Sequence, residues 1–352
     1  MTMETIDLIE PEDGSVTAPL QEHRLHPDDD GPFESTGSED AYAWNNLEIV
    51  SVDRSVPKPV TLSWSKIQRG WRSVTYDIVL SPSPEFGQDC IHLNAVAKPH
   101  TEVWHLFIGV TYYWKVDAHR GGEKVAESGM SRFTTNSLPP RWIKVPGTTN
   151  VRDLGGWPLP QNKRIRQGMI YRSSELNSNL NITERGRRVL EDDLKIRTDL
   201  DLRGEHDHGG PALDPEKVQW INVPISPYDC ICDAAFRDGY RKIFETFADP
   251  TNFPVLFHCI GGADRGGTVA FLLNALLGKR RELLMRDYEL TSLSIWGDRS
   301  RASEQFRGLM DALLPFGNDP EDIQGQVEKY VLSLGLSAHA IESIRGLLIV
   351  QD

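Results

Sequence analysis

Hydrophobic and polar positions alternate with a period of two in the first third of the chain. Three segments show the alternation most clearly: PVTLSWS at 59–65, SVTYDIVL at 73–80 and TYYWKVDA at 111–118. SRFTT at 131–135 ends the region, and Arg120-Gly121-Gly122 is a turn signal inside it. Short alternating strands separated by turns predict an all-β sandwich. The acidic, proline-containing segment 26–40 is expected to be a loop or disordered.

Beyond the linker NSLPPR at 136–141, strand-like and helix-like periods take turns. Strands are predicted within 194–203, at 218–225 and at 253–259, and the last is nearly all apolar, as a strand buried on both faces should be. Helical spacing covers 183–194, 235–248, 268–278, 280–292, 301–314, 321–334 and 337–349. This order predicts an α/β domain with a mainly parallel central sheet. The chain is therefore expected to be multidomain, with a sandwich at 1–137 and an α/β domain at 138–352.

Composition limits the classes of function. A length of 352 residues suits two domains, and a net charge of −13 disfavours a nucleic-acid partner, although one pocket can still be positive. The first twelve residues lack the basic and apolar parts of a signal peptide, and no run reaches the ~18 apolar residues of a membrane span. We therefore expect a cytoplasmic location and no integral membrane segment.

The cysteines are expected to be mostly free thiols, because a chain of this size needs no disulfides. Cys230 and Cys232 form a C-x-C pair without a second cluster of ligands, and the histidines include no H-x-x-x-H pair. A metal site is not expected, and no cofactor is implied.

The most informative segment is HCIGGADRGGT, in which Cys259 follows the apolar strand and a helix begins near Arg265. Binding sites in such sheets lie beyond the carboxyl ends of strands. A glycine-rich loop turns its N–H groups inward around an anion, and the helix N-terminus adds positive potential. Arg265 can bind a tetrahedral oxyanion through two hydrogen bonds, and all three features favour a thiolate at Cys259. The loop residues expected around phosphate are Ile260, Gly261, Gly262, Ala263, Asp264 and Arg265.

Less specific interpretations remain open for this segment. A buried cysteine often ends a strand, and a glycine-rich turn can bind a nucleotide phosphate without reacting. An apolar strand, His-Cys, Gly262, Arg265 and an immediate apolar helix together favour catalysis at phosphorus.

The order His258-Cys259-x5-Arg265 resembles the signature loop of cysteine-dependent protein tyrosine phosphatases, and more narrowly the bacterial and fungal tyrosine/lipid phosphatases with H-C-x-x-G-K-D-R-T-G. TTNVRDLGGWPL at 148–159, MIYRSSEL at 169–176 and the segment 181–207 resemble further elements of that subfamily. The resemblance covers about 142–350. Independently, Trp64 and the strand TYYWKVDA make the first region similar to a fibronectin type III domain. We expect this domain to be an accessory module that binds a protein partner.

The phosphatase resemblance implies roles for particular residues. Cys259 would be the nucleophile, Arg265 the phosphate clamp, and His258 a residue that tunes the thiolate through hydrogen bonds. Asp264 is favoured as general acid because the subfamily loop carries an aspartate there. Asp229 is the alternative, since other tyrosine phosphatases use an aspartate on a mobile loop some thirty residues before the cysteine.

Other positions are expected to support the pocket. Asn150, Arg152 and Asp153 would brace its wall, and an ion pair is at least as good an account of Arg152 and Asp153 as substrate contact. Arg203, which ends a strand, is expected to be structural. Asp233 lies behind Asp229 in the same predicted loop.

Two positions depart from the subfamily pattern. Ala263 replaces a lysine that suits multiply phosphorylated lipids, which weakens a lipid substrate. Gly266 replaces a Thr or Ser whose hydroxyl assists the thiolate as leaving group, so breakdown of the phosphoenzyme would be slow unless Thr268 substitutes.

The sequence thus predicts a metal-independent phosphatase that acts through a phosphocysteine intermediate, with phosphotyrosine on proteins as the favoured substrate. The alternatives are a phosphoinositide or inositol-phosphate phosphatase, or a catalytically weak phosphate-binding adaptor.

Overall fold

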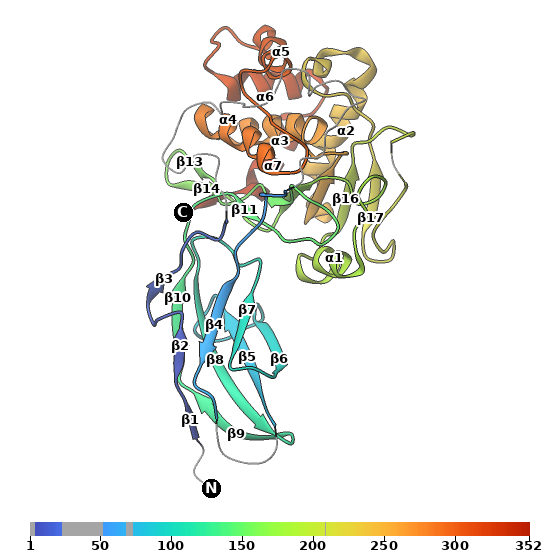
Figure 1. Ribbon diagram of the computed structural model, residues 1–352. Helices are drawn as coiled ribbons and strands as arrows, with labels where there is room; N and C mark the ends of the chain where they lie inside the picture. The colour runs from blue at the N-terminus through green and yellow to red at the C-terminus, as the bar shows by residue number, and fades with distance from the viewer. Residues whose placement is uncertain (1–3, 23–51, 68–72, 208) are drawn as a thin grey trace. The chain divides into compact units, whose positions relative to one another are not determined.

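The computed structural model describes residues 4–22, 52–67, 73–207 and 209–352 (Figure 1). Two compact units make up the chain: Met1–Leu20 with Pro57–Pro139, and Gln21–Val56 with Pro140–Asp352. The expected boundary at 137/138 thus lies close to the second crossing between the units. The same division placed 21–56 with the sandwich, whereas the described residues of that range, 21–22 and 52–56, belong to the second unit. The expected loop at 26–40 lies outside the described residues.

The first unit is a β-sandwich, as the alternation predicted. Its larger sheet runs β1-β9-β8-β10-β3, with β5 pairing β8 and β6, and the smaller sheet runs β2-β4-β7. The strands are β1 (Glu4–Ile6), β2 (Leu8–Glu10), β3 (Ser15–Val16), β4 (Val60–Trp64), β5 (Val74–Ser81), β6 (Ile91–Val96), β7 (His100–Val103), β8 (Thr111–Arg120), β9 (Glu123–Ser128) and β10 (Ser131–Thr134).

Period-two alternation supplies the core of this sandwich, because successive side chains of a strand point to opposite faces. Val60, Leu62 and Trp64 of β4 are buried against the alternate residues of β5 and β8. Trp64 packs edge-on against Tyr76, with ring centroids 5.2 Å apart.

The second unit has a six-stranded sheet in the order β11-β12-β15-β18-β16-β17. The four strands from β15 to β17 run parallel, and β11 and β12 pair antiparallel at one edge. The strands are β11 (Arg141–Trp142), β12 (Arg152–Asp153), β15 (Ile170–Ser173), β16 (Thr198–Asp201), β17 (Gln219–Asn222) and β18 (Val255–His258). A second, three-stranded sheet joins β13 (Pro158–Leu159), β14 (Lys163–Ile165) and β19 (Ile349–Gln351).

The helices lie where the 3.6-residue period placed them, with ends shifted by a few residues (Figure 1). The α-helices are α1 (Glu184–Arg188), α2 (Arg237–Ala248), α3 (Arg265–Leu276), α4 (Arg281–Glu289), α5 (Glu304–Leu313), α6 (Ile323–Ser333) and α7 (Ala338–Leu348). Single turns of other helix types are η2 (Val189–Asp193), η3 (Tyr228–Cys232), η4 (Ala234–Phe236), η5 (Pro250–Asn252), η6 (Leu290–Leu293) and η7 (Leu314–Phe316).

The central strand β18 is buried on both faces, which explains why its segment reads as a nearly unbroken apolar run. Val255 and Phe257 of β18 enter the larger core with α2, α3 and the C-terminal helices, whereas Leu256 points into a smaller core beside α1. Every residue of α3 is buried. The central strand and its following helix are thus the most deeply enclosed elements, and the cysteine loop joins them.

Among the described residues, no helix has the length and apolar character needed to cross a bilayer.

Candidate active site

The turn from β18 into α3 is shaped by a close approach to β15. Gly262 has a φ of +62°, and a Cβ at this position would collide with the Ser173 carbonyl group. Only glycine therefore fits, because the left-handed backbone and the contact both exclude a side chain. The Gly262 carbonyl oxygen accepts a hydrogen bond from Nη2 of Arg172. The loop between Cys259 and Arg265 therefore lies directly against β15.

Cys259 is 3% exposed and stands at the carboxyl end of the parallel strand β18. The first turn of α3 follows within six residues and approaches the thiol at Gly266. A Cβ added at Gly266 would lie 3.9 Å from Cys259 Sγ, an ordinary contact distance. The space beside the sulfur that a Ser or Thr would occupy is therefore open.

Arg265 is nearly buried, at the first position of α3. Its Nη1 donates to Oδ2 of Asp207 at 3.0 Å and lies 3.5 Å from the Leu202 carbonyl oxygen. A bound phosphate and the Asp207 carboxylate would both be acceptors for this guanidinium.

Asp264 is engaged in a strong pair. Arg299 donates to both of its carboxylate oxygens, at 3.0 and 3.1 Å, and the Tyr228 hydroxyl donates to Oδ1. Burial by itself would raise the pKa of Asp264, but Arg299 and the hydrogen bonds outweigh it and lower the pKa. Asp264 is thus held as an anion, whereas a general acid must carry a proton when the leaving group departs.

Asp229 lies on η3, with an exposed side chain beside Gly308 of α5, where a Cβ would come within 3.6 Å of it. The hydroxyl of its neighbour Tyr228 connects η3 to the cysteine loop through Asp264, and it also lies 2.9 Å from the Tyr288 hydroxyl on α4. The Tyr228 backbone N–H donates to Oγ1 of Thr268 at 3.0 Å. The Thr268 hydroxyl therefore braces η3.

His258 packs against the neighbouring strand β16. Its Nε2 lies 3.0 Å from Oδ1 of Asp199, and its Nδ1 lies 3.9 Å from Oδ1 of Asp201. Burial lowers the pKa of His258, but the two carboxylates outweigh burial, and the net shift is upward. A protonated imidazole directly before Cys259 is consistent with the tuning role that the resemblance implied.

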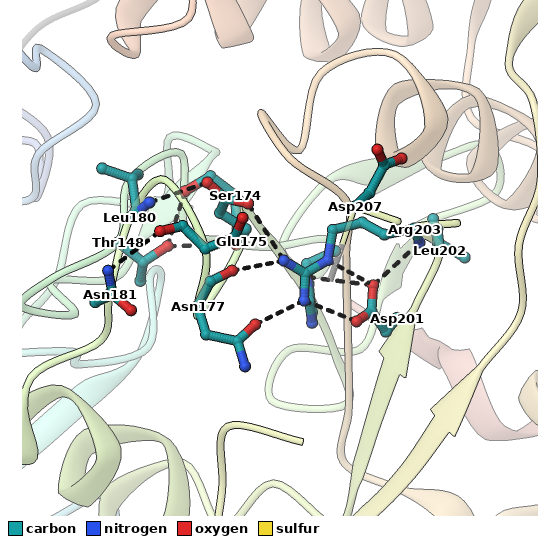
Figure 2. A network of polar contacts seen from close by, with 12 residues as sticks. Thr148, Ser174, Glu175, Asn177, Leu180, Asn181, Asp201, Leu202, Arg203 and Asp207 are labelled. Atoms are coloured by element: carbon teal, nitrogen blue, oxygen red, sulfur yellow. Dashed lines mark hydrogen bonds and ion pairs between the residues drawn. The ribbon is translucent and has the colours of Figure 1, made fainter. Parts of the chain in front are cut away.

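Asp201 also belongs to a network around Arg203 (Figure 2). The guanidinium lies between Asp201, which it meets at 2.8 and 2.9 Å, and Asn177, whose carbonyl and amide oxygens it meets at 2.6 and 2.8 Å. Glu175 lies 3.2 Å from Nη1, and its backbone N–H donates to the Ile260 carbonyl oxygen. Arg203 therefore supports the loop as a structural residue, as the sequence suggested.

Arg152 and Asp153 are both buried ion-pair residues, but they do not pair with each other. Nε of Arg152 meets Oδ1 of Asp287 at 3.1 Å, and Asp153 meets Nη1 of Arg141 at 2.7 Å. Arg152 also donates to Oδ1 of Asn150. The Asn150 amide in turn donates to the Gly261 carbonyl oxygen at 3.1 Å, so these residues brace the wall of the loop.

Arg172, which the sequence reasoning passed over, lies directly behind the loop. It is buried, and its Nε and Nη1 have no hydrogen-bond partner within the part of the chain that the structure describes. Burial and the nearby Arg152 lower its pKa to about 9. The segment MIYRSSEL contained this residue, but a motif does not reveal that a side chain turns under a loop ninety residues away.

The four cysteines are unpaired, as expected. Within the described ranges, no three His, Cys, Asp or Glu side chains are grouped so that they could hold a metal ion.

A cysteine at the end of a central parallel strand, followed by a glycine-shaped loop and by a helix that begins with an arginine, is an arrangement typical of anion-binding sites. Residues 143–350 match the model of the tyrosine phosphatase family, and the chain belongs to that family. The resemblance of the cysteine loop and its companion motifs is confirmed.

A protein of Cupriavidus necator, provisionally described as a tyrosine-protein phosphatase, is 27% identical over 164 residues. The match covers 40% of this chain and 59% of that relative's length.

Two solved structures are similar to parts of the chain. The core catalytic domain of the PP-IP phosphatase SIW14 from S. cerevisiae, in complex with citrate, is 17% identical, with a TM-score of 0.30. The match covers 48% of this chain and 92% of the SIW14 chain. An Fn3-like protein from Clostridium thermocellum is 16% identical, with a TM-score of 0.19. That match covers 23% of this chain and 80% of the Fn3-like protein's chain. At these TM-scores neither structure is a guide to the substrate of this chain.

Proposed function

We propose that this protein hydrolyses phosphomonoesters through a phosphocysteine intermediate, and that phosphotyrosine on proteins is its substrate class. The observation that carries the proposal is the placement of Cys259 between the end of β18 and the first turn of α3, with Arg265 on that turn. This placement supports the proposal, because a nucleophile and hydrogen-bond donors would then lie on the same side of one tetrahedral anion.

In the first step the Cys259 thiolate attacks phosphorus, an S–P bond forms, and the P–O bond to the leaving group breaks. The loop amides and Arg265 neutralise the charge on the three phosphoryl oxygens. The departing oxygen carries the electron pair of the broken bond and takes a proton from an acid or from water. Asp264 and Asp229 are the two residues proposed as that acid.

In the second step water attacks phosphorus, the S–P bond breaks, and the thiolate leaves as inorganic phosphate forms. The proton lost by water goes to a base, for which an ionised Asp264 has the right protonation state. No hydroxyl at position 266 assists the departing thiolate, because this residue is glycine. We therefore propose that this second step limits turnover.

The state of Asp264 favours aryl over alkyl phosphates. A carboxylate that Arg299 keeps ionised gives little help to a leaving group that must be protonated. Tyrosine, with a pKa of about 10, departs far more easily without help than an alkyl alcohol does. Ala263, in place of a lysine, removes charge that a multiply phosphorylated inositol would use. Both features favour phosphotyrosine over inositol phosphates.

Turnover of p-nitrophenyl phosphate by the full chain, with EDTA present, tests the proposal. We expect hydrolysis by the wild type and none by Cys259→Ser, with matching thermal unfolding curves. A long-lived adduct should be trapped on Cys259 after rapid quenching. A folded wild type that binds phosphate but never turns over would replace the enzyme with a phosphate-binding adaptor.

Preference among substrates is a separate measurement. Phosphotyrosine peptides should be hydrolysed faster than soluble inositol phosphates at equal concentration. The reverse order would favour the inositol-phosphate alternative while leaving the cysteine mechanism intact. We also propose that the sandwich binds a protein partner, that the domain boundary lies near residue 137, and that the protein is cytoplasmic.

A further inference from the structure

A short segment from the N-terminal part of the sequence is built into the wall of the cysteine loop. Residues 52–56, called the strap below, belong to the second unit, although the segment that follows directly, Pro57–Pro139, forms the sandwich together with Met1–Leu20. The family match begins at 143, so the strap lies outside the part of the chain that defines the family. Its contacts are therefore made by residues outside the matched region.

The strap is hydrogen-bonded to Thr149 and Asn150. Oγ of Ser55 accepts a hydrogen bond from the Asn150 backbone N–H at 3.1 Å, and Ser55 is 4% exposed. Oδ2 of Asp53 accepts from the Thr149 hydroxyl at 2.6 Å. Oδ1 of Asp53 accepts from the N–H of Ser55 at 2.9 Å and from its hydroxyl, so the strap is also held in a defined turn.

The other side of the strap is anchored as well. The Arg54 backbone N–H donates to the Leu293 carbonyl oxygen at 2.7 Å, next to the segment that leads to Arg299. Val52 is exposed and takes no part in these contacts.

Asn150 links the strap to the cysteine loop. It is fully buried, with a φ of +58°, a left-handed conformation that a non-glycine residue keeps only when its surroundings hold it. Its side-chain amide donates to the Gly261 carbonyl oxygen at 3.1 Å. Ser55 is therefore two hydrogen bonds away from the loop that surrounds Cys259.

We propose that Ser55 and Asp53 are positioning residues for the cysteine loop, acting through the left-handed Asn150 on the Gly261 carbonyl group. The inference rests on the proposed function for its effect on turnover, but not for its effect on the loop itself. When the strap is lost, Asn150 relaxes from its left-handed conformation and Gly261 loses its donor. The loop amides then no longer converge on one phosphate.

Ser55→Ala is the first variant, with Val52→Ala as the matched control on the same strap. We expect Ser55→Ala to lower kcat for p-nitrophenyl phosphate roughly tenfold, with a smaller change in KM, since a lost buried hydrogen bond misaligns groups that act in the transition state. Val52→Ala should turn over as the wild type does. Asp53→Asn keeps Oδ1 as an acceptor but not Oδ2, and should have an intermediate effect.

A double-mutant cycle tests the route through Asn150. Asn150→Gly preserves the left-handed backbone but removes the amide that reaches Gly261. If Ser55 acts through that amide, Ser55→Ala should cost less than about twofold in the Asn150→Gly background. Equal losses in both backgrounds would overturn the proposed route.

Backbone amide exchange gives a readout that does not need turnover. Peptides that contain 259–266 should exchange faster in Ser55→Ala than in Val52→Ala, whereas peptides from α7 should not change. Unchanged exchange in the loop would overturn the inference even if the wild type is an active phosphatase. Faster exchange with an inactive wild type would instead support the inference and remove the proposed function.

Discussion

Asp264 and Arg299 form a two-pronged ion pair, with Nε to Oδ1 at 3.0 Å and Nη2 to Oδ2 at 3.1 Å, across 35 residues of sequence. The pair fixes the residue that precedes Arg265 and joins the start of α3 to the segment after η6. Tyr228 adds a third hydrogen bond to the same carboxylate, so three separate parts of the chain meet at one loop residue.

Breaking this pair from one side should destabilise the protein. Arg299→Met leaves the Asp264 carboxylate without its cation, and we expect a loss of roughly 1–3 kcal/mol in the free energy of unfolding, since Asp264 is only partly buried. Asp264→Asn combined with Arg299→Met should recover part of that loss. Urea unfolding of the single and double variants measures both values. Additive losses would show that the pair is not coupled.

The general acid can be identified through leaving groups that differ in their need for a proton. If Asp264 is the acid, Asp264→Asn should lower kcat/KM for phenyl phosphate about 10²-fold and for p-nitrophenyl phosphate much less, because kcat/KM reports the first step even when the second step limits kcat. Asp229→Asn should then slow both substrates equally and slightly. Because the pKa of Asp264 is lowered, its acid form becomes populated only at low pH, so wild-type kcat/KM for phenyl phosphate should rise as pH falls until the thiolate is protonated. The opposite selectivity would assign the acid to Asp229.

Gly266→Ser should accelerate the second chemical step. The added Cβ makes an ordinary contact with Cys259 Sγ, and its hydroxyl can donate to the departing thiolate. We expect breakdown of the trapped phosphoenzyme to quicken roughly tenfold, the worth of one hydrogen bond to an anion. Gly266→Ala provides the same Cβ without the hydroxyl and serves as control. An equal acceleration in both variants would refute the hydrogen-bond account.

Arg172 should matter more for anion binding than for stability. Replacement of a buried, incompletely paired guanidinium by an apolar side chain of similar length is often neutral or stabilising. Arg172→Met should therefore change the thermal midpoint little, while the inhibition constant for vanadate rises roughly tenfold, because positive charge behind the loop is lost. Arg172→Lys keeps the charge and should bind vanadate with intermediate affinity. A variant that unfolds far more readily but binds vanadate as tightly would show a purely structural role.

The sequence predicted the parts of this molecule that are written in local patterns. Val60, Leu62 and Trp64 revealed a buried face by alternation, and the apolar run before Cys259 revealed the central strand. The contacts of Asp264 with Arg299 and Tyr228, and of Asn150 with Ser55, span 35, 36 and 95 residues. No period or motif links such positions, because only the folded chain brings them together. The sequence pattern around Asp264 therefore does not reveal that Arg299 holds this residue as an anion.

His258 should make the stability of the protein depend on pH. Burial disfavours its charge, but Asp199 and Asp201 outweigh burial and raise the pKa above the usual 6.5, with Arg203 opposing them weakly. A raised folded-state pKa contributes stability that is fully present below about pH 6.5 and is lost as pH rises through the folded value. Each unit of the upward shift contributes about 1.4 kcal/mol.

The measurement is urea unfolding at a series of pH values from about 5.5 to about 9, in steps of about half a pH unit. This range includes the ordinary histidine pKa of about 6.5. The wild-type free energy of unfolding should fall across this window relative to His258→Asn, which cannot titrate there. The variant will be less stable at low pH, since it leaves Asp199 and Asp201 without their cation, and the two curves should converge as pH rises. Parallel curves would mean that His258 is neutral in the folded protein, and its influence on Cys259 would then be limited to the hydrogen bonds of an uncharged ring.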